Sequence, residues 1–267
     1  PAPSPPSPGT APRMPQPCEG GLRLGLRKTS AVDYPGRLSA VLFFPGCNLR
    51  CPWCHNPELV NPAAIAAGEA DRLGLPEILS FLEKRRNVLG GVVLSGGEPT
   101  LHSCLGELAA AVRSMGYPLK LDTNGTIPGA LRALLADEAC RPDYIALDLK
   151  LPPRLYGRLG AAGEKAPSSS GLAEALEESC RLIAASGIPH EYRTLVLPAG
   201  SPSEEELREM ARWADGAAWY FASFRAGGCL DPRWNDYDPP SDAQVLQAVG
   251  LARSLGKAAE SRSAHPS

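Results

Sequence analysis

Short apolar segments alternate with longer amphipathic segments along most of the chain. Six apolar runs rich in β-branched or aromatic residues have the length and composition of buried strands, and a stretch of helical character follows each run. The expected strands are residues 38–44, 92–95, 119–122, 144–149, 191–197 and 219–224, and the expected helices are 76–85, 104–115, 130–135, 172–186, 203–213 and 241–254. Strand-then-helix units in succession predict parallel strands joined by crossover helices.

Local signals at helix starts support this pattern. Pro76 suits a first helical turn, and Ser203 followed by Glu206 forms a capping-box pattern. Residues 22–27 could add a peripheral strand before the first unit. Two α/β architectures fit: an open doubly wound sheet, or a barrel that stops short of eight units. Both place functional residues at the carboxyl ends of the strands.

The two ends of the chain differ from this pattern. Residues 1–19 carry eight prolines, which exclude a stable helix or an inner strand and predict a disordered, Pro-rich tail. Residues 257–267 are small and polar, and we expect a flexible C-terminal tail there. Residues 20–256 then form one domain, a normal size for a single core.

Composition narrows the class of protein. The chain of 267 residues has 27 basic and 29 acidic side chains, giving a net charge of −2 without a basic run, so we expect no nucleic-acid or membrane partner. Neither an apolar run near membrane-spanning length nor a secretion signal is visible, so we expect a soluble, cytoplasmic protein. Eight cysteines are present, and the clustering of three of them predicts a metal centre rather than a disulfide framework.

These three cysteines, Cys47, Cys51 and Cys54, directly follow the first expected strand. Gly46 and Pro52 suit a loop that bends tightly around inorganic sulfur, and thiolates are the ligands of iron–sulfur clusters. Three ligands leave one iron of a 4Fe-4S cluster open to an external ligand, as a catalytic zinc site leaves one position open.

Structural zinc is the alternative, with His55 or a distant cysteine as fourth ligand. His55 is adjacent to Cys54, which makes joint coordination of one tetrahedral ion awkward. Zinc sites also usually combine two closely spaced ligand pairs, and the chain has no second pair. The remaining cysteines show no ligand spacing and are expected to be small buried side chains.

The second expected strand runs into Gly96, Gly97 and Glu98. Glycines at a strand end allow a ligand to approach the backbone closely, and a carboxylate accepts charge-assisted hydrogen bonds from an ammonium group. A simple strand-to-helix turn is the alternative interpretation.

Polar residues also lie at the ends of the third and fourth expected strands: Asp122 and Asn124 at the third, and Asp148 and Lys150 at the fourth. Arg193 lies within the fifth strand. Buried carboxylates need cations or donors, so these side chains are candidates for a shared polar site. Salt bridges at loop mouths, or a structural ion pair for Arg193, would also explain them.

The Cys-x3-Cys-x2-Cys spacing with an aromatic residue before the last cysteine resembles the signature of the radical S-adenosylmethionine (SAM) superfamily. Residues 28–36, 44–47 and 54–60 further resemble the activating proteins of anaerobic ribonucleoside-triphosphate reductase, which belong to the glycyl-radical-enzyme activases. The resemblance extends in order over residues 22–225.

This resemblance implies an incomplete (β/α)6 TIM-like barrel with a radical SAM core. It implies that Cys47, Cys51 and Cys54 hold a 4Fe-4S cluster, and that SAM chelates the open iron. The remaining candidates would line the SAM pocket, with the Gly-Gly-Glu motif at the SAM amino group, Arg193 at its carboxylate, and the aspartates helping to hold a monovalent cation. They are Gly96, Gly97, Glu98, Asp122, Asn124, Asp148, Lys150 and Arg193.

The activity implied is reductive cleavage of SAM and abstraction of a glycine Cα hydrogen on a partner enzyme. The partner would be anaerobic ribonucleotide reductase, and flavodoxin or ferredoxin would donate the electron. Three alternatives stay open: activation of another glycyl radical enzyme such as a formate-lyase-like one, radical chemistry on a small molecule or peptide, and a non-catalytic metal-binding protein.

Overall fold

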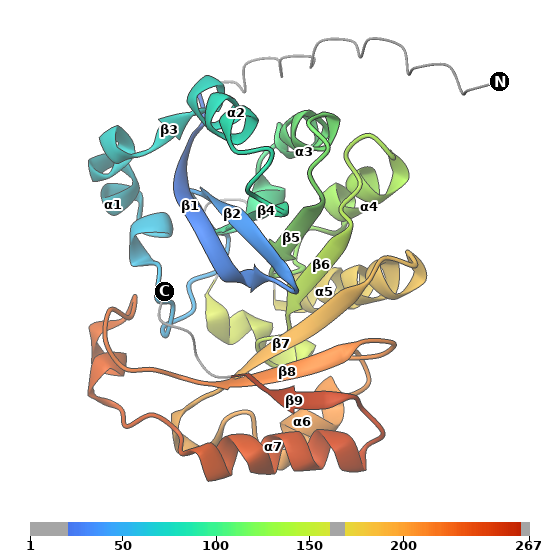
Figure 1. Ribbon diagram of the computed structural model, residues 1–267. Helices are drawn as coiled ribbons and strands as arrows, with labels where there is room; N and C mark the ends of the chain where they lie inside the picture. The colour runs from blue at the N-terminus through green and yellow to red at the C-terminus, as the bar shows by residue number, and fades with distance from the viewer. Residues whose placement is uncertain (1–20, 161–168, 263–267) are drawn as a thin grey trace, which may run out of the picture.

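The computed structural model describes residues 21–160 and 169–262. Within them, nine strands form one sheet in the order β3-β1-β2-β4-β5-β6-β7-β8-β9 (Figure 1). The strands are β1 Arg23–Tyr34, β2 Arg37–Phe44, β3 Leu73–Gly74, β4 Gly91–Gly96, β5 Leu119–Thr123, β6 Tyr144–Asp148, β7 His190–Val196, β8 Ala218–Ser223 and β9 Ala259–Ser261.

All strand pairs from β2 through β9 are parallel, whereas β1 pairs with β2 and β3 in antiparallel orientation. The six expected strands are therefore confirmed, each within two residues of its expected ends. The expected peripheral strand at 22–27 is also present, as the first half of the longer strand β1.

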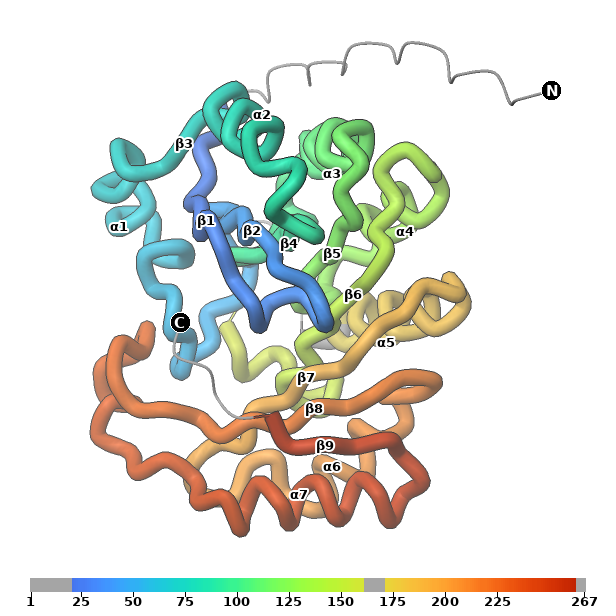
Figure 2. The backbone as a smooth tube through the Cα atoms, viewed as in Figure 1, coloured from blue at the N-terminus to red at the C-terminus, as the bar shows by residue number. Residues whose placement is uncertain are grey.

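The sheet curls into a partial barrel. β3 and β9 end the strand order without pairing with each other, so the barrel is not closed. Its curvature is visible in the backbone trace, where β1 and β9 lie on opposite sides of the opening (Figure 2). Side chains from β1, β4, β5, β6, β7 and β8 line one cavity, which only a curved sheet allows. The incomplete TIM-like barrel is thus confirmed over the open doubly wound sheet.

Helices cover the outer face of the sheet. The six expected helices correspond to α2–α7, and the capping box of Ser203 and Glu206 starts α6. The helices are α1 Pro62–Ala67, α2 Leu75–Lys84, α3 Leu105–Ser114, α4 Pro128–Ala136, α5 Ser169–Ala185, α6 Glu204–Met210 and α7 Asp242–Ser254. Short 3-10 helices lie in the connections: η1 Pro57–Leu59, η2 Glu69–Asp71, η3 Pro99–Leu101, η4 Pro153–Leu159, η5 Pro198–Gly200 and η6 Pro232–Asp236. Among the described residues, no helix combines the length and apolar character needed to cross a bilayer.

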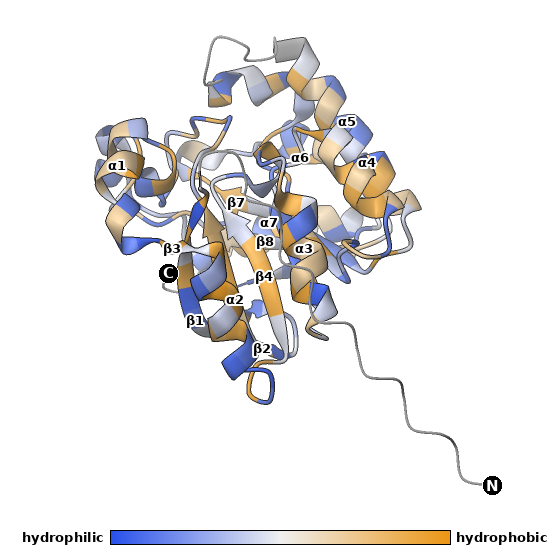
Figure 3. Cartoon of the chain, turned by 90° about the horizontal axis from the view of Figure 1, so that it is seen from above, coloured by the Kyte–Doolittle hydropathy of each residue, from blue (hydrophilic) through white to orange (hydrophobic). Residues whose placement is uncertain are grey.

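Two apolar clusters pack on opposite faces of the sheet. The larger cluster packs between strands and helices and includes Leu94, Leu121 and Leu147, each at most 1% exposed. Figure 3 shows β4 mostly in hydrophobic colour beneath helices with mixed faces. A smaller cluster of Tyr34 and Val93 with their neighbours fills part of the barrel interior. Because side chains alternate along a strand, the remaining inward positions are free to carry polar groups.

The C-terminal end departs from expectation. Ala259–Ser261 pairs with Trp219–Phe221 as β9, so the flexible tail expected from residue 257 is wrong for residues 259–262. The strand has three residues and one buried side chain, which is too short to give a periodic signal. The expected Pro-rich tail, residues 1–19, lies outside the described residues.

Candidate functional site

The cysteine loop leaves the carboxyl end of β2 and stays close to the barrel. Cys51 is buried, and Cys47 and Cys54 are half-buried. Backbone hydrogen bonds shape the loop: Cys54 N donates to Cys51 O at 3.0 Å. The Arg50 guanidinium donates to the carbonyl of Cys47 at 2.6 Å. Hydrogen bonds within the loop, from its backbone and from Arg50, thus shape it.

Gly96 and Gly97 join the end of β4 to this loop. Gly97 N donates to Phe44 O, and Glu98 N donates to Gly46 O, both at 2.8 Å. A Cβ built on Gly97 would overlap the carbonyl oxygen of Gly46, and one on Gly96 would overlap the backbone of Phe44. Gly96 also has φ 122°, a conformation that favours glycine. The sequence predicted that a ligand approaches these glycines, and in the structure the backbone of Phe44 and Gly46 approaches them closely.

Glu98 is fully buried, and protein donors surround its carboxylate. Oε1 accepts from Thr100 N at 3.1 Å, Thr100 Oγ1 at 2.5 Å and Thr123 Oγ1 at 2.8 Å. Oε2 accepts from Asn124 N at 2.7 Å. Burial raises the pKa of Glu98, and these donors lower it by less than burial raises it. The carboxylate fastens the end of β4 to the end of β5 and the loop that follows it.

Asn124 connects the loop after β5 to the cysteine loop. Its amide nitrogen lies 3.0 Å from Asn48 Oδ1 and 3.8 Å from Cys47 Sγ. Its Oδ1 accepts from the backbone and hydroxyl of Thr126, and that hydroxyl accepts from Asn48 Nδ2 at 2.7 Å. Hydrogen bonds of this kind orient metal ligands and tune a metal centre. The structure thus gives Asn124 a cysteine neighbour that the spacing alone could not reveal.

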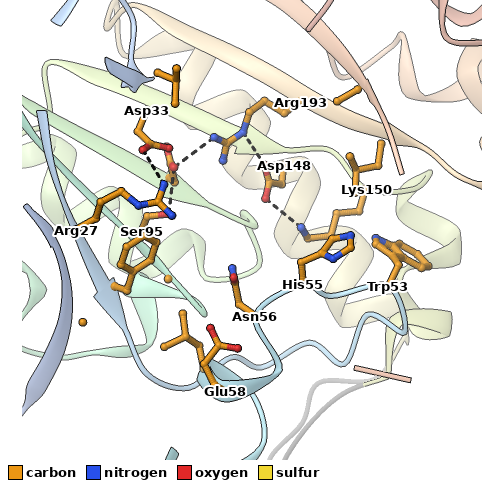
Figure 4. A pocket seen from close by; sticks show the side chains of 18 of the residues that line it. Arg27, Asp33, Trp53, His55, Asn56, Glu58, Ser95, Asp148, Lys150 and Arg193 are labelled. Atoms are coloured by element: carbon orange, nitrogen blue, oxygen red, sulfur yellow. Dashed lines mark hydrogen bonds and ion pairs between the residues drawn. The ribbon is translucent and has the colours of Figure 1, made fainter. Parts of the chain in front are cut away.

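A row of alternating charges crosses the barrel interior next to the cysteines. Lys120 Nζ lies 2.7 Å from Asp122 Oδ1. Arg193 lies between the two aspartates, with Nη1 3.3 Å from Asp122 Oδ2 and Nε 2.8 Å from Asp148 Oδ1. Lys150 Nζ ends the row, 3.0 Å from Asp148 Oδ2 (Figure 4). We call these five side chains the charge row.

The charge row shifts the titration of its members. Burial would raise the pKa of Asp148, but Arg193 and Lys150 lower it well below its usual range. Burial likewise disfavours the charged forms of Arg193 and Lys150, yet the aspartates raise both pKa values. Asp148, Arg193 and Lys150 therefore stay charged over the physiological range.

Burial favours the uncharged form of the cysteine thiols in the loop, whereas the members of the charge row keep their charge. Burial raises the pKa of Cys51 to about 12, and the nearby Lys150 ammonium offsets this only in part. Burial also raises the pKa of Cys47. Buried thiols of this kind become thiolates when a metal replaces the proton. The cysteine loop therefore suits a metal centre better than a free nucleophile.

A second ion pair completes the interior beside the charge row. The carboxylate of Glu191 on β7 is fully buried and accepts from Arg262 at 2.9 and 3.0 Å and from the Tyr144 hydroxyl at 3.0 Å. The Arg262 guanidinium stacks on the Tyr220 ring at 3.8 Å. Arg262 directly follows β9, so the unexpected strand brings a half-buried cationic partner to the buried carboxylate.

The segment after β8 covers the outer side of the cysteine loop. Leu230 N donates to Cys54 O and Asp231 N donates to Pro52 O, both at 2.9 Å. The Trp53 and Trp234 rings are 5.1 Å apart. No apolar periodicity marks this segment, so sequence reasoning missed its role.

The cysteines do not form a closed single-ion site. His55, the alternative zinc ligand, has its Nδ1 3.1 Å from Gly227 O. Within residues 21–160 and 169–262, no three His, Cys, Asp or Glu side chains are arranged to hold one metal ion. A sulfur-bridged cluster spreads its thiolates more widely than one tetrahedral ion does, so this spacing is compatible with a cluster.

Two connected cavities meet at this site. A smaller cavity of about 180 Å³ is lined by all three cysteines together with Gly96, Gly97 and Asn124. A larger one of about 910 Å³ extends into the barrel and shares Asp148, Lys150 and Arg193 with the first. The larger volume is within the range of about 300–1,000 Å³ that small-molecule sites occupy. A cysteine-lined space therefore shares part of its wall with one large enough for a cofactor and part of a substrate.

The residues expected from the sequence thus gather around one cavity, and the structure adds four that were not expected. Ser95 donates to Asp122 at 3.1 Å, and Lys120 pairs with the same carboxylate. Glu191 and Arg262 form the neighbouring ion pair. The alternation Lys120-Leu121-Asp122 could have indicated that two of these side chains share a face. The other cysteines in the described residues, 104, 140, 180 and 229, are buried as expected, and Cys18 lies outside those residues.

Among known proteins, this chain is similar in sequence to two activating enzymes and to a deazaguanine synthase. A provisionally named glycyl-radical enzyme activating enzyme of Methanocaldococcus jannaschii is 26% identical over 86% of this chain and 90% of its own length. Pyruvate formate-lyase-activating enzyme of Clostridium pasteurianum is 29% identical over 67% of this chain and 70% of its own. A 7-carboxy-7-deazaguanine synthase of Methanopyrus kandleri is 35% identical, but over 45% of this chain and 52% of its own.

Similarity in fold and in family leads to the same conclusion. The crystal structure of a radical SAM methyltransferase from Sphaerobacter thermophilus matches 92% of this chain and 78% of its own with a TM-score of 0.61 at 16% identity, which indicates a shared fold. The family model of the radical SAM superfamily matches residues 41–214, from within β2 to just beyond α6, a span that includes the cysteine loop and the charge row. This chain therefore belongs to the radical SAM superfamily, and it is an enzyme of radical chemistry.

Proposed function

We propose that this chain is a glycyl-radical-enzyme activase whose partner is anaerobic ribonucleoside-triphosphate reductase. The observation that carries the activase proposal is the similarity to the M. jannaschii activating enzyme over 86% of this chain. The matches to the 7-carboxy-7-deazaguanine synthases of M. kandleri and Hyperthermus butylicus cover less, 45% and 66% of this chain. The choice of partner rests on residues 28–36 and 54–60, which resemble reductase activating proteins.

The side chains around the cavities have distinct tasks in this proposal. Cys47, Cys51 and Cys54 hold the 4Fe-4S cluster, because they line the smaller cavity together. The backbone of Gly96 and Gly97 borders the space for the amino acid part of SAM. When bound, the cluster and SAM supply a 5′-deoxyadenosyl radical, formed by one-electron cleavage of the sulfonium C–S bond, that takes the glycine hydrogen.

Other polar residues bind and orient the cofactor without proton transfer. Lys150 lies between the cysteines and Asp148, so its ammonium offsets negative charge on the thiolates. Asn124 orients Cys47, and Glu98 fixes the loop beneath it. A one-electron donor such as flavodoxin or ferredoxin completes the cycle in the cytoplasm.

The open side of the barrel supports a macromolecular substrate. β1 and β9 leave an opening, and residues from both of its sides, Arg27 and Arg262, line the larger cavity. A loop that carries a glycine could enter there, whereas a closed barrel would exclude it. Burial of the cavity walls keeps water away from a reactive carbon radical.

Electron paramagnetic resonance tests the proposal. The reconstituted chain is incubated anaerobically with SAM, reductant and purified reductase, and we expect a glycyl doublet on the reductase together with 5′-deoxyadenosine. Cys51→Ala should abolish both signals, whereas Cys140→Ala, which removes an equally buried thiol remote from the cavities, should retain them. A doublet on a formate-lyase-like enzyme but not on reductase would reassign the partner.

Deazaguanine synthesis is the second candidate, favoured by the 35% identity of the partial match. It predicts turnover of a small molecule in the absence of any partner protein. Incubation of the reconstituted chain with SAM, reductant and a small-molecule extract, without any partner protein, and a search for 7-carboxy-7-deazaguanine by mass spectrometry tests this candidate. Formation of a deazaguanine without a glycyl signal would favour it over the activase.

A further inference from the structure

The resemblance to activases implied that Asp122 and Asp148 help to hold a monovalent cation. Such a site needs carboxylate oxygens that are free to bind an ion. In this chain, Arg193 and Lys150 hydrogen-bond to the two oxygens of Asp148, and Arg193 hydrogen-bonds to Oδ2 of Asp122. Asp122 Oδ1 accepts no hydrogen bond, but the Lys120 ammonium lies 2.7 Å away and occupies the space beside it. Asp122 Oδ2 also accepts from Ser95 at 3.1 Å. The residues present therefore do not fit a further cation.

The balance of charge gives the same answer. The charge row contains two carboxylates and three cationic side chains, so its net charge is +1. The adjacent pair of Glu191 and Arg262 adds one charge of each sign and leaves the balance unchanged. A bound potassium or sodium ion would add a further positive charge directly beside the three cationic side chains of the charge row, where charges are poorly screened.

Strand register explains why Arg193 reaches both aspartates. Asp148 on β6 is the register partner of Arg193 on β7, so their side chains are direct neighbours. Asp122 on β5 is opposite Ala146 on β6. The small Ala146 side chain leaves room for the guanidinium to pass over β6 and contact Asp122 diagonally. A planar fork with several donors suits this double contact better than an ammonium group does.

We propose that Arg193 is a built-in counter-ion between Asp122 and Asp148, and that SAM binding by this chain requires no monovalent cation. Arg193 is a positioning residue in this role: its Nε and Nη1 hold the two aspartates that border both cavities. Its side chain is 28% exposed and lines both cavities, so the same guanidinium also presents positive charge to a carboxylate of SAM. The proposal concerns the cofactor site and is independent of the molecule that the radical attacks.

Cation replacement in the wild-type protein is the first test. SAM affinity of the anaerobically reconstituted chain is measured by calorimetry in chloride salts of potassium, sodium and tetramethylammonium at equal ionic strength. We expect dissociation constants within about twofold of one another, below the range of about 5–150-fold typical of coupled sites. Weakening of about tenfold in tetramethylammonium would overturn the proposal.

Removal of the guanidinium is the second test. In Arg193→Met, the two aspartates lose their shared cation, so potassium should tighten SAM binding by about fivefold or more relative to tetramethylammonium. Arg208→Met removes an exposed arginine on α6 and should show no such response. A folded Arg193→Met protein whose SAM affinity ignores potassium would also overturn the proposal.

Thermal unfolding of the cluster-free protein gives a readout that does not involve SAM or activity. The wild-type midpoint should be the same in potassium and tetramethylammonium, whereas potassium should raise the midpoint of Arg193→Met. If that variant does not fold, Arg193→Lys replaces it, since a single ammonium cannot span both aspartates and should leave a partial potassium response. Neither measurement uses a partner protein, so failure of this inference is distinct from failure of the activase assignment.

Discussion

The buried carboxylate of Glu98 allows a sharp test of what the Gly-Gly-Glu motif does in this chain. If the carboxylate mainly fastens the loops, Glu98→Gln should destabilise the protein and loosen the cysteine loop. If it mainly binds the SAM amino group, the substitution should weaken SAM binding and leave stability nearly unchanged. The melting temperature and the SAM affinity of Glu98→Gln therefore distinguish the two roles.

The expected loss follows from the hydrogen bonds of Glu98. In Glu98→Gln, the side-chain oxygen can keep the three hydrogen bonds of Oε1. The NH2 group then takes the place of Oε2, which accepts from Asn124 N at 2.7 Å, so two N–H donors face each other. Losing one charge-assisted bond costs about 1.5–3 kcal/mol. Removing the buried charge recovers part of this, because burial raises the pKa of Glu98. We expect a net loss of about 2 kcal/mol, or about 4–8 °C in melting temperature.

Thermal unfolding of the cluster-free protein under reducing conditions measures this loss, and iron content per chain after reconstitution reports on the loop. Glu206→Gln is the matched control, because glutamine also completes a capping box and the expected change is below about 0.5 kcal/mol. An unchanged melting temperature for Glu98→Gln, combined with SAM binding weakened about a hundredfold, would refute the structural role.

Three further substitutions test other parts of the site by unfolding experiments. Gly97→Ala should prevent the close backbone contact with the cysteine loop and abolish cluster retention, whereas Gly250→Ala, with open space around it in α7, should stabilise by about 0.5–1 kcal/mol. Arg262→Ala should destabilise by about 3 kcal/mol because its buried glutamate partner loses its counter-ion, while exposed Arg208→Ala should change stability by less than about 1 kcal/mol. The pKa of Asp148 is lowered in the folded protein, so its ionised carboxylate stabilises the fold above about pH 4, and this stabilisation is lost as the pH falls further. Asp148→Asn should therefore flatten the acid side of a curve of unfolding free energy against pH. An unchanged acid side would contradict the role of the charge row.

The strands and the cysteine site could be predicted because each is encoded locally. A parallel strand covered on both faces is a short apolar run, and Cys47, Cys51 and Cys54 form their pattern within one loop. β9 could not be predicted, because three residues with one buried side chain carry no periodicity. Its place depends on pairing with β8, which is a tertiary interaction.

The roles of individual polar residues were harder to predict than their presence. Spacing indicated that Asp122, Asp148 and Arg193 share a site, but strand register decides that one guanidinium joins both aspartates. Glu98 was expected to face an ammonium group, and its four protein donors come from residues that are distant in the sequence or lie in the following turn. Such contacts require knowledge of which loops meet, and local sequence does not contain it.

The pairing of Glu191 with Arg262 also has a consequence for synthesis of the chain. The two residues are 71 positions apart, and Arg262 is the later one. At about 5–20 residues per second, about 4–14 seconds separate their translation. During that interval the Glu191 carboxylate has the Tyr144 hydroxyl as a donor but lacks both hydrogen bonds from Arg262, so this part of the interior completes its hydrogen bonding only after β9 has been made. The order of translation therefore delays final closure of the interior until well after the cysteine loop has emerged.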